Sequence, residues 1–273
     1  MKLSDNPLAL SSFFLPDPSY ETLKKCKDCG ISSLELSIGG VLPAAENSVI
    51  QQYWLRLIDA SQRAGVNLWS AHLSFWEPYD IANLDKSVRD AALERQFDMM
   101  RFVHENTDIK IFVVHPSSEP ILPENRFMQT QYSKNSLRAL ADEAEKYGSV
   151  IAIEDLPRTC LGNTTESMQQ LISADKRLRI CLDTNHLLRD TNEDFIRAFC
   201  DKIITLHVSD YDRIDERHLM PYEGINNWKL IFTLLLRCGY KGPVLFEIMY
   251  DKGYTYEQIR ECYDRLCGEC ENI

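Results

Sequence analysis

Residues 178–186 read LRICLDTNH, a short apolar run that ends in two potential metal ligands, Asp183 and His186. The same arrangement recurs along the chain, where a β-branched or leucine-rich run ends in a histidine or a carboxylate. Five further runs share it: NLWSAH at 67–72, IKIFVVH at 109–115, SVIAIE at 149–154, IITLH at 203–207 and GPVLFE at 242–247. Short apolar runs bounded by turn residues are typical of buried parallel strands. The polar residues therefore lie at the carboxyl ends of predicted strands.

Strand-like runs alternate with amphipathic segments over the whole sequence. The strands are predicted at 7–14, 32–38, 67–74, 109–115, 149–155, 178–183, 203–209 and 243–249. The helices are predicted at 18–29, 47–64, 86–106, 124–147, 164–175, 192–201, 226–238 and 255–267. Such alternation indicates a parallel sheet, and eight units in about 250 residues match a (β/α)₈ barrel. We therefore expect an α/β fold with a single TIM-barrel domain over residues 1–273.

An open doubly wound sheet is the structural alternative to the barrel. That fold typically carries a glycine-rich phosphate turn after its first strand. Here the first predicted strand runs into SSFFLPDPSYE at 11–21, which contains no glycine. The sequence therefore favours the closed barrel.

Composition limits the classes of partner. The formal net charge of −11 disfavours nucleic acid, because phosphate binding relies mainly on lysine and arginine. No apolar stretch approaches the roughly 18 residues of a membrane span, and the amino-terminal residues do not resemble a secretion signal. We expect a cytoplasmic protein with no membrane partner. Barrels of this kind can form homo-oligomers, although no residue of the sequence argues for one.

The nine cysteines are an odd number in a chain without a secretion signal, so free thiols are expected. One pattern offers an alternative. Cys26 and Cys29 end the first predicted helix, and Cys267 and Cys270 end the last, so a closed barrel could bring the two pairs together around a structural zinc ion.

Four strand-end residues suit one divalent metal: Glu154, Asp183, His207 and Glu247. Three carboxylates and one imidazole make a hard site that fits Mn²⁺ or Mg²⁺ and tolerates Co²⁺ or Zn²⁺. A single strand-end carboxylate more often caps a helix or pairs with arginine. Their occurrence on four consecutive strands favours a metal site, because barrel chemistry gathers at the carboxyl ends of the strands.

Glu154 and Glu247 come from strands separated by two others, so they can approach the centre of the barrel mouth from opposed sides. Two carboxylates that face each other across a metal-held substrate could remove a proton and return it to the same or a neighbouring carbon. The residues therefore indicate a sugar isomerase or epimerase that works through an enediolate, with Glu154 and Glu247 as acid and base.

Further side chains are expected around the same mouth. His72, His115 and His186 either hydrogen-bond substrate hydroxyls or ligate additional metals. Arg158 is a candidate for a substrate oxygen or phosphate, because a guanidinium grips two oxygens at once. Trp76 is expected to form an apolar wall of the pocket.

Glu35 lies in the second predicted strand. It either reaches the mouth or lies in the barrel interior, and the sequence leaves both open.

Four segments carry a family resemblance: IAIEDLPRTCLGNTTES at 151–167, ICLDTNHLL at 180–188, ITLHVSDYDRIDERHLMPYEGINNW at 204–228 and YKGPVLFEI at 240–248. From residue 70 onward the chain resembles the xylose isomerase-like barrel superfamily. That superfamily contains sugar and sugar-phosphate isomerases and epimerases, and also the endonuclease IV type of apurinic-site nucleases. The resemblance implies a metal-dependent enzyme without deciding the activity.

The epimerase branch implies one metal at Glu154, Asp183, His207 and Glu247, with the two glutamates as acid and base and His186 near the substrate. Ketose 3-epimerases of that branch carry a further glutamate six residues after the first metal glutamate. This chain has Cys160 there, which puts a close relation to those enzymes in doubt.

The nuclease branch implies three zinc ions, which use in addition His72, His115, His186 and an Asp-x-His pair. The pair reads Glu216-Arg217-His218 here, so nine positions are filled with one exchange. The surrounding sequence differs: that branch resembles CVDTCH with a glycine-rich turn after the pair, whereas this chain has CLDTNH and HLMPYEG. In the epimerase interpretation, Glu216 and His218 contact the substrate instead.

These patterns favour a metal-dependent isomerase or epimerase of a small sugar, sugar phosphate or polyol derivative, with one divalent metal and a small carbohydrate as partner. Three alternatives stay open: a trinuclear zinc phosphodiesterase on abasic DNA, a polyhydroxy-acid dehydratase, and a barrel that only binds a sugar or a partner.

Overall fold

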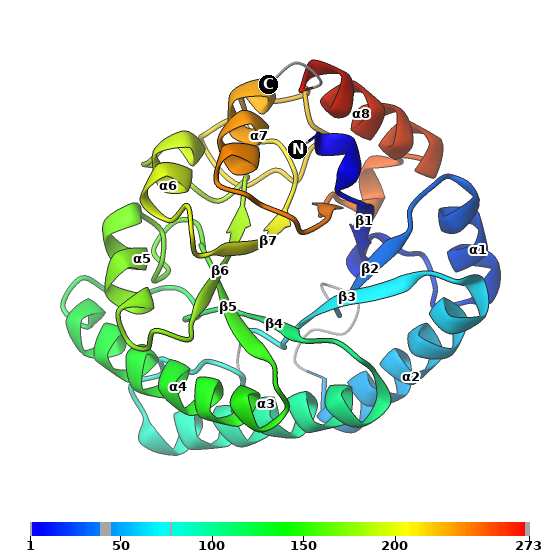
Figure 1. Ribbon diagram of the computed structural model, residues 1–273. Coiled ribbons are helices and arrows are strands. Elements are labelled where there is room, and N and C mark those ends of the chain that lie inside the picture. The colour runs from blue at the N-terminus through cyan, green and yellow to red at the C-terminus, as the bar shows by residue number, and fades with distance from the viewer. Residues whose placement is uncertain (1, 39–44, 77, 271–273) are drawn as a thin grey trace.

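Eight parallel strands form the centre of the molecule in a computed structural model that describes residues 2–38, 45–76 and 78–270. They are β1 (Leu8–Ser11), β2 (Ser33–Leu36), β3 (Asn67–His72), β4 (Ile111–Val114), β5 (Val150–Glu154), β6 (Arg179–Asp183), β7 (Ile203–His207) and β8 (Val244–Phe246). Figure 1 shows the strands as an inner ring within a belt of helices. The expected (β/α)₈ TIM barrel is confirmed.

The ring runs in the order β7-β6-β5-β4-β3-β2-β1-β8. It closes through a parallel bridge between Val208 and Phe246, just beyond β7 and at the end of β8. The pairing register shifts at two places, between Leu34 and Glu35 in β2 and between Ile180 and Cys181 in β6. Such irregularities change where the following side chains point, and both lie close to functional residues.

Eight helices cover the ring: α1 (Tyr20–Asp28), α2 (Asn47–Ala64), α3 (Lys86–Asn106), α4 (Arg126–Lys146), α5 (Thr165–Ile172), α6 (Asn192–Ala198), α7 (Trp228–Arg237) and α8 (Tyr256–Glu269). The helix α7 illustrates why they form. Its buried residues Trp228, Ile231, Phe232, Leu235 and Leu236 recur at the spacing of one helix face, and the Asn227 side chain caps its first turn by accepting from the backbone N–H of Leu230.

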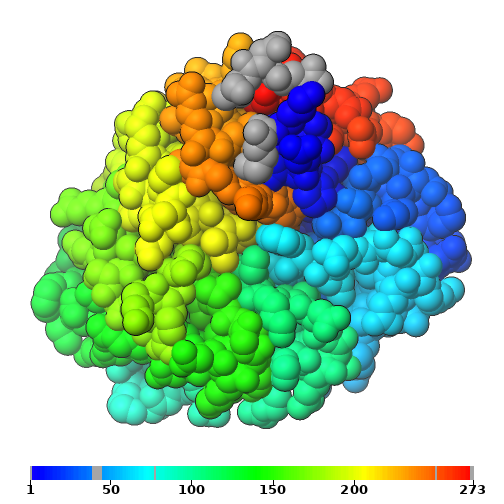
Figure 2. All heavy atoms as spheres, in the orientation of Figure 1, coloured from blue at the N-terminus to red at the C-terminus, as the bar shows by residue number. Residues whose placement is uncertain are grey.

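Segments near the two ends of the chain pack together where the first and last units of the barrel meet. A short 3₁₀ helix, η1 (Leu3–Asp5), packs on α8, and Figure 2 shows the first residues beside the last helices. The Tyr263 hydroxyl of α8 donates to the backbone carbonyl of Asn6 at 2.6 Å. This contact ties α8 to the strand that follows Asn6.

The predicted strand segments contain the observed strands, which are shorter. The two largest differences lie at 243–249, where β8 has only three residues, and at 7–14, where β1 ends at Ser11 and a 3₁₀ helix, η2 (Ser12–Phe14), follows. Ser11 ends the strand because its hydroxyl accepts from the backbone N–H of Phe13 and so starts the turn. A further 3₁₀ helix, η4 (Tyr250–Lys252), follows β8.

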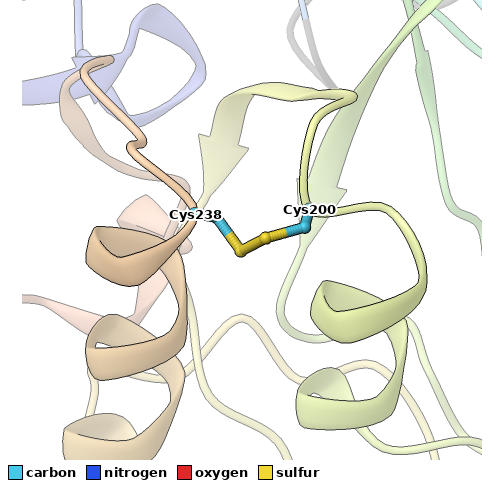
Figure 3. The surroundings of a disulfide bond; sticks show 2 residues. All are labelled: Cys200 and Cys238. Atoms are coloured by element: carbon cyan, nitrogen blue, oxygen red, sulfur yellow. A yellow bond between two sulfur atoms is a disulfide. The ribbon is translucent and has the colours of Figure 1, made fainter.

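Not all cysteines are free thiols, and the expectation to the contrary was wrong. Cys200 and Cys238 form a disulfide between the end of α6 and the end of α7, with their Cα atoms 5.2 Å apart (Figure 3). The two residues are 38 positions apart in sequence. Only the packing of α6 against α7 makes them neighbours.

The zinc clamp between the two terminal cysteine pairs is also wrong. Cys29 lies beside Glu257, at the start of α8, whereas Cys267 and Cys270 lie at the other end of that helix. Ten residues of helix separate Glu257 from Cys267, which corresponds to roughly 15 Å. Within the described ranges, no group of metal-capable side chains contains a cysteine.

None of the helices in the described part of the chain is both long enough and apolar enough to cross a membrane.

Candidate metal-binding active site

Glu154, Asp183, His207 and Glu247 meet at the carboxyl ends of β5, β6, β7 and β8, and their ligand atoms all lie within 4.8 Å of one another. We refer to these residues as the four-donor group. The Nδ1 atom of His207 lies 3.1 Å from Oε1 of Glu154 and 2.9 Å from Oε2 of Glu247. The four residues that the sequence assigned to one metal are therefore neighbours in space.

The surroundings of Asp183 fit a cation. Its carboxylate is fully buried, and its Oδ2 atom has no hydrogen-bond partner in the part of the chain that the structure describes. Burial, together with nearby Glu247 and Glu154, raises the pKa of Asp183 well above its usual value. An orphaned carboxylate oxygen among other carboxylates is the donor set that a hard divalent cation stabilises.

A second group of donors lies beside the first and shares Glu154 with it. It consists of His72 at the end of β3, His115 just after β4, and Glu154. The Oε2 atom of Glu154 lies 2.9 Å from Nε2 of His72 and 3.1 Å from Nε2 of His115. Because its Oε1 atom faces His207, Glu154 stands between the two groups with one oxygen toward each.

A third group consists of His186, Glu216 and His218. Its closest contact joins Nε2 of His186 to Oε2 of Glu216 at 3.1 Å. The same Nε2 atom lies 3.5 Å from Oδ2 of Asp183, so this group adjoins the four-donor group. Together the three groups contain the nine residues of the trinuclear set that the sequence could fill.

Hydrogen bonds fix the orientation of the histidine rings. The Nδ1 atoms of His72, His186 and His218 lie 2.8, 2.8 and 3.0 Å from backbone carbonyls, those of Leu73, Asp155 and Glu247 respectively. A carbonyl can only accept, so each Nδ1 carries the proton and leaves Nε2 toward the site. Metal-binding histidines are usually held in this way.

The charged groups of the site shift the pKa values of their neighbours. Burial alone would lower the pKa of His186, but Asp183, Glu216 and Glu154 raise it well above the usual range. Burial alone would raise the pKa of Glu216, but His186 and Arg158 lower it to about 2. A proton on His186 therefore balances the clustered carboxylates, and a bound cation could take over that role.

The guanidinium of Arg158, which the sequence offered as a substrate ligand, is held by three carboxylates. It donates to Glu119 at 2.9 and 2.6 Å and to Asp215 at 2.7 Å, and it lies 2.8 Å from Oε1 of Glu216. Most of its N–H groups are therefore engaged. One structural effect is clear: Arg158 holds Oε1 of Glu216 and leaves Oε2 toward His186.

A cavity of about 420 Å³ opens above the donors. Seven of the nine donor residues line it, and one wall is formed by Phe75 and Trp76, whose rings lie 4.9 Å apart, with Phe75 stacked on His115 at 4.4 Å. Trp76, which the sequence offered as an apolar wall, lies in this lining. Phe75 was missed, although it lies in the same HLSFW segment. The volume falls in the range of small-molecule sites.

Backbone strain is concentrated at this cavity. Five non-glycine residues in the described ranges have a positive φ, and three of them, Trp76, Arg158 and His218, line the cavity. Positive φ is unfavourable for side chains of this size and tends to persist where the surroundings enforce it. The strain accompanies the placement of the Trp76 and His218 rings at the site.

Most of the chain matches the model of one family. The model of the xylose isomerase-like TIM barrel matches residues 23–266. The chain belongs to this family. The uncharacterized protein MJ1311 of Methanocaldococcus jannaschii is similar to this chain. The two are 26% identical over 248 residues, which cover 87% of this chain and 81% of the relative.

Solved structures share the same fold. A D-tagatose 3-epimerase-like protein superposes with a TM-score of 0.78 at 23% identity, covering 96% of this chain and 98% of the other. A D-psicose 3-epimerase from Clostridium cellulolyticum H10, solved with D-tagatose, superposes with a TM-score of 0.75 at 17% identity, covering 97% and 98%. At such identities the likeness concerns the barrel architecture, so the function has to be argued from the site.

Proposed function

We propose that this protein is a divalent-metal-dependent isomerase or epimerase of a small sugar, sugar phosphate or polyol derivative. The observation that carries the proposal is that Glu154 and Glu247, which both line one small cavity, converge on one imidazole nitrogen of His207 at 3.1 and 2.9 Å. Two carboxylates and a cation site then share one substrate-sized space.

The mechanism uses these two carboxylates. A divalent cation held by the four-donor group, Mn²⁺, Mg²⁺, Co²⁺ or Zn²⁺, would polarise a substrate oxygen and acidify the adjacent C–H. One glutamate removes that proton, and the other returns a proton to the same or a neighbouring carbon through an enediolate. Both glutamates line the cavity, so both can reach a substrate there.

The remaining polar residues of the cavity bind the substrate in this proposal. His72, His115, His186, Glu216 and His218 present nitrogen or oxygen atoms to its hydroxyl groups, and Trp76 covers its less polar face. Arg158 contributes mainly through Glu216, because carboxylates already occupy its guanidinium. Likeness to epimerase structures and membership of the family support a carbohydrate substrate.

A second candidate is hydrolysis of a phosphoester with cations in all three groups. The observation that favours it is the position of Glu154, whose two oxygens face two different donor groups and leave little freedom for acid–base work. Abasic DNA is disfavoured as its substrate. Arg158 is the one lysine or arginine among the described residues that line the cavity, and carboxylates bind it.

Solvent proton exchange tests the proposal. The metal-loaded protein is incubated in deuterated water with a panel of ketoses, aldoses and their phosphates, and isomers and deuterium incorporation are measured by NMR. We expect incorporation with at least one substrate, its loss in Glu154→Gln and Glu247→Gln, and its retention in Glu124→Gln, an exposed glutamate outside the cavity.

Three other results would contradict the proposal. Release of inorganic phosphate or cleavage of phosphodiesters without exchange would establish the hydrolase instead. Loss of water from the substrate would indicate a dehydratase. Exchange that survives both substitutions would remove Glu154 and Glu247 as acid and base.

A further inference from the structure

A carboxylate that the proposed mechanism does not use lies beneath the four-donor group. Glu35, on β2, is fully buried in the barrel interior, with 0% of its surface exposed. It does not line the cavity above the donors. Burying a carboxylate is costly unless it is paired and hydrogen-bonded, so the partners of Glu35 indicate its purpose.

Glu35 has two partners from different strands. Its Oε1 atom lies 3.0 Å from Nε2 of His207 on β7, and its Oε2 atom accepts from the Ser70 hydroxyl on β3 at 2.7 Å. In the described part of the chain, His207 is its one ion-pair partner. Ser70 thus fixes the rotamer of Glu35, and Glu35 in turn reaches an imidazole that lies three strands away around the ring.

The contact determines which nitrogen of His207 faces the donors. With a cation at the four-donor group, a neutral ring carries its proton on Nε2, where Glu35 accepts it, and keeps the lone pair for the cation on Nδ1. That atom faces Glu154 and Glu247 at 3.1 and 2.9 Å. His207 therefore turns Nδ1 toward the donors, whereas His72, His186 and His218 turn Nε2 toward the site, and a carboxylate takes the place of the backbone carbonyls that hold those three rings.

We propose that Glu35 is a positioning residue for the metal site, which orients the imidazole of His207 and increases its donor strength through the hydrogen bond to Nε2. The inference rests on the proposed cation at the four-donor group. It adds a residue from β2, a strand that supplies none of the nine donors. Partners of metal-bound histidines commonly change metal affinity by roughly 10–100-fold.

Metal affinity is the decisive measurement. The Kd for Zn²⁺ and for Mn²⁺ is determined by competition with a chromophoric chelator for the wild type, Glu35→Gln and Glu35→Leu. Thr205→Val serves as the matched control. Thr205 is also buried in the barrel interior on β7, but its hydroxyl accepts a hydrogen bond from the indole N–H of Trp69 at 3.1 Å rather than from His207. Circular dichroism verifies that each variant is folded.

We expect Glu35→Gln to raise the Kd for the metal by roughly 10-fold and Glu35→Leu to raise it by up to roughly 100-fold. The Kd of Thr205→Val should stay within about twofold of the wild-type value. A wild-type Kd in Glu35→Gln would overturn the inference, as would an equal loss in Thr205→Val. Should Glu35→Leu not fold, Glu35→Gln alone decides. A wild type that binds metal but exchanges no protons would refute the isomerase while leaving this inference intact, and a wild type that binds no cation would refute both.

Discussion

The side-chain carbonyl of Asn185 accepts a hydrogen bond from the backbone N–H of His218 at 3.1 Å, and it also accepts one from Arg217 at 2.8 Å. Asn185 is buried directly after β6, whereas His218 lies in the long connection after β7. The two bonds hold the segment that carries Glu216 and His218 against the end of β6. The third donor group therefore depends on a residue that is not one of the nine donors.

Replacement of Asn185 is expected to affect this group selectively. Asn185→Leu keeps the approximate volume but removes the acceptor, so Glu216 and His218 should lose their position. If the protein holds three zinc ions, elemental analysis should find two in this variant and three in Asn185→Asp, which retains an acceptor oxygen. Equal zinc content in all three proteins would show that Asn185 has no such role.

Removal of divalent metal should destabilise the protein. Glu154, Asp183 and Glu247 are buried within one group, and a cation that binds only the folded state adds stability that rises with the logarithm of its concentration relative to Kd. At about 100 times the Kd the gain is about 2.7 kcal/mol, or a rise of roughly 5 °C in Tm for a domain of this size. Calorimetry with EDTA and with added Mn²⁺ or Zn²⁺ measures the effect. An unchanged Tm in both media would argue against a metal site.

The disulfide between Cys200 and Cys238 should stabilise the fold under oxidising conditions. Closing a loop of this length restricts the unfolded chain and is typically worth roughly 2–4 kcal/mol. Cys200→Ser should therefore lower the free energy of unfolding by about that amount in urea titrations. Cys29→Ser, which changes a half-buried free thiol, serves as the control. If dithiothreitol leaves the wild type unchanged, the bond contributes nothing to stability.

The ion pair of Asp175 should make stability depend on pH. The Arg177 side chain, by hydrogen bonding, lowers the pKa of Asp175 from 3.8 to about 2. Because the folded-state pKa lies below the unfolded-state value, the contribution is full above about pH 4 and is lost as the pH falls toward 2. Asp175→Asn should therefore be less stable than the wild type at pH 6, with the difference vanishing near pH 2. A difference that stays constant between pH 6 and pH 2 would contradict this assignment.

The sequence by itself determined the barrel and the residues of the candidate metal site. Periodicity is a local property, so the eight strands and eight helices could be predicted from runs of apolar residues such as 178–183. Parallel strands in a barrel all end at one face, so Glu154, Asp183, His207 and Glu247 had to be neighbours once the fold was known.

Only the tertiary structure decided which partners several of the important side chains contact. Glu35 lies below the donors and Arg158 binds carboxylates because of strand register and loop conformation, which the sequence does not encode locally. The same holds for Asn185, which was missed because its partners are backbone groups more than 30 residues away, and for Cys200 and Cys238, which helix packing brings together. Contacts between distant parts of the chain depend on the packing of the whole barrel, and no short stretch of sequence specifies them.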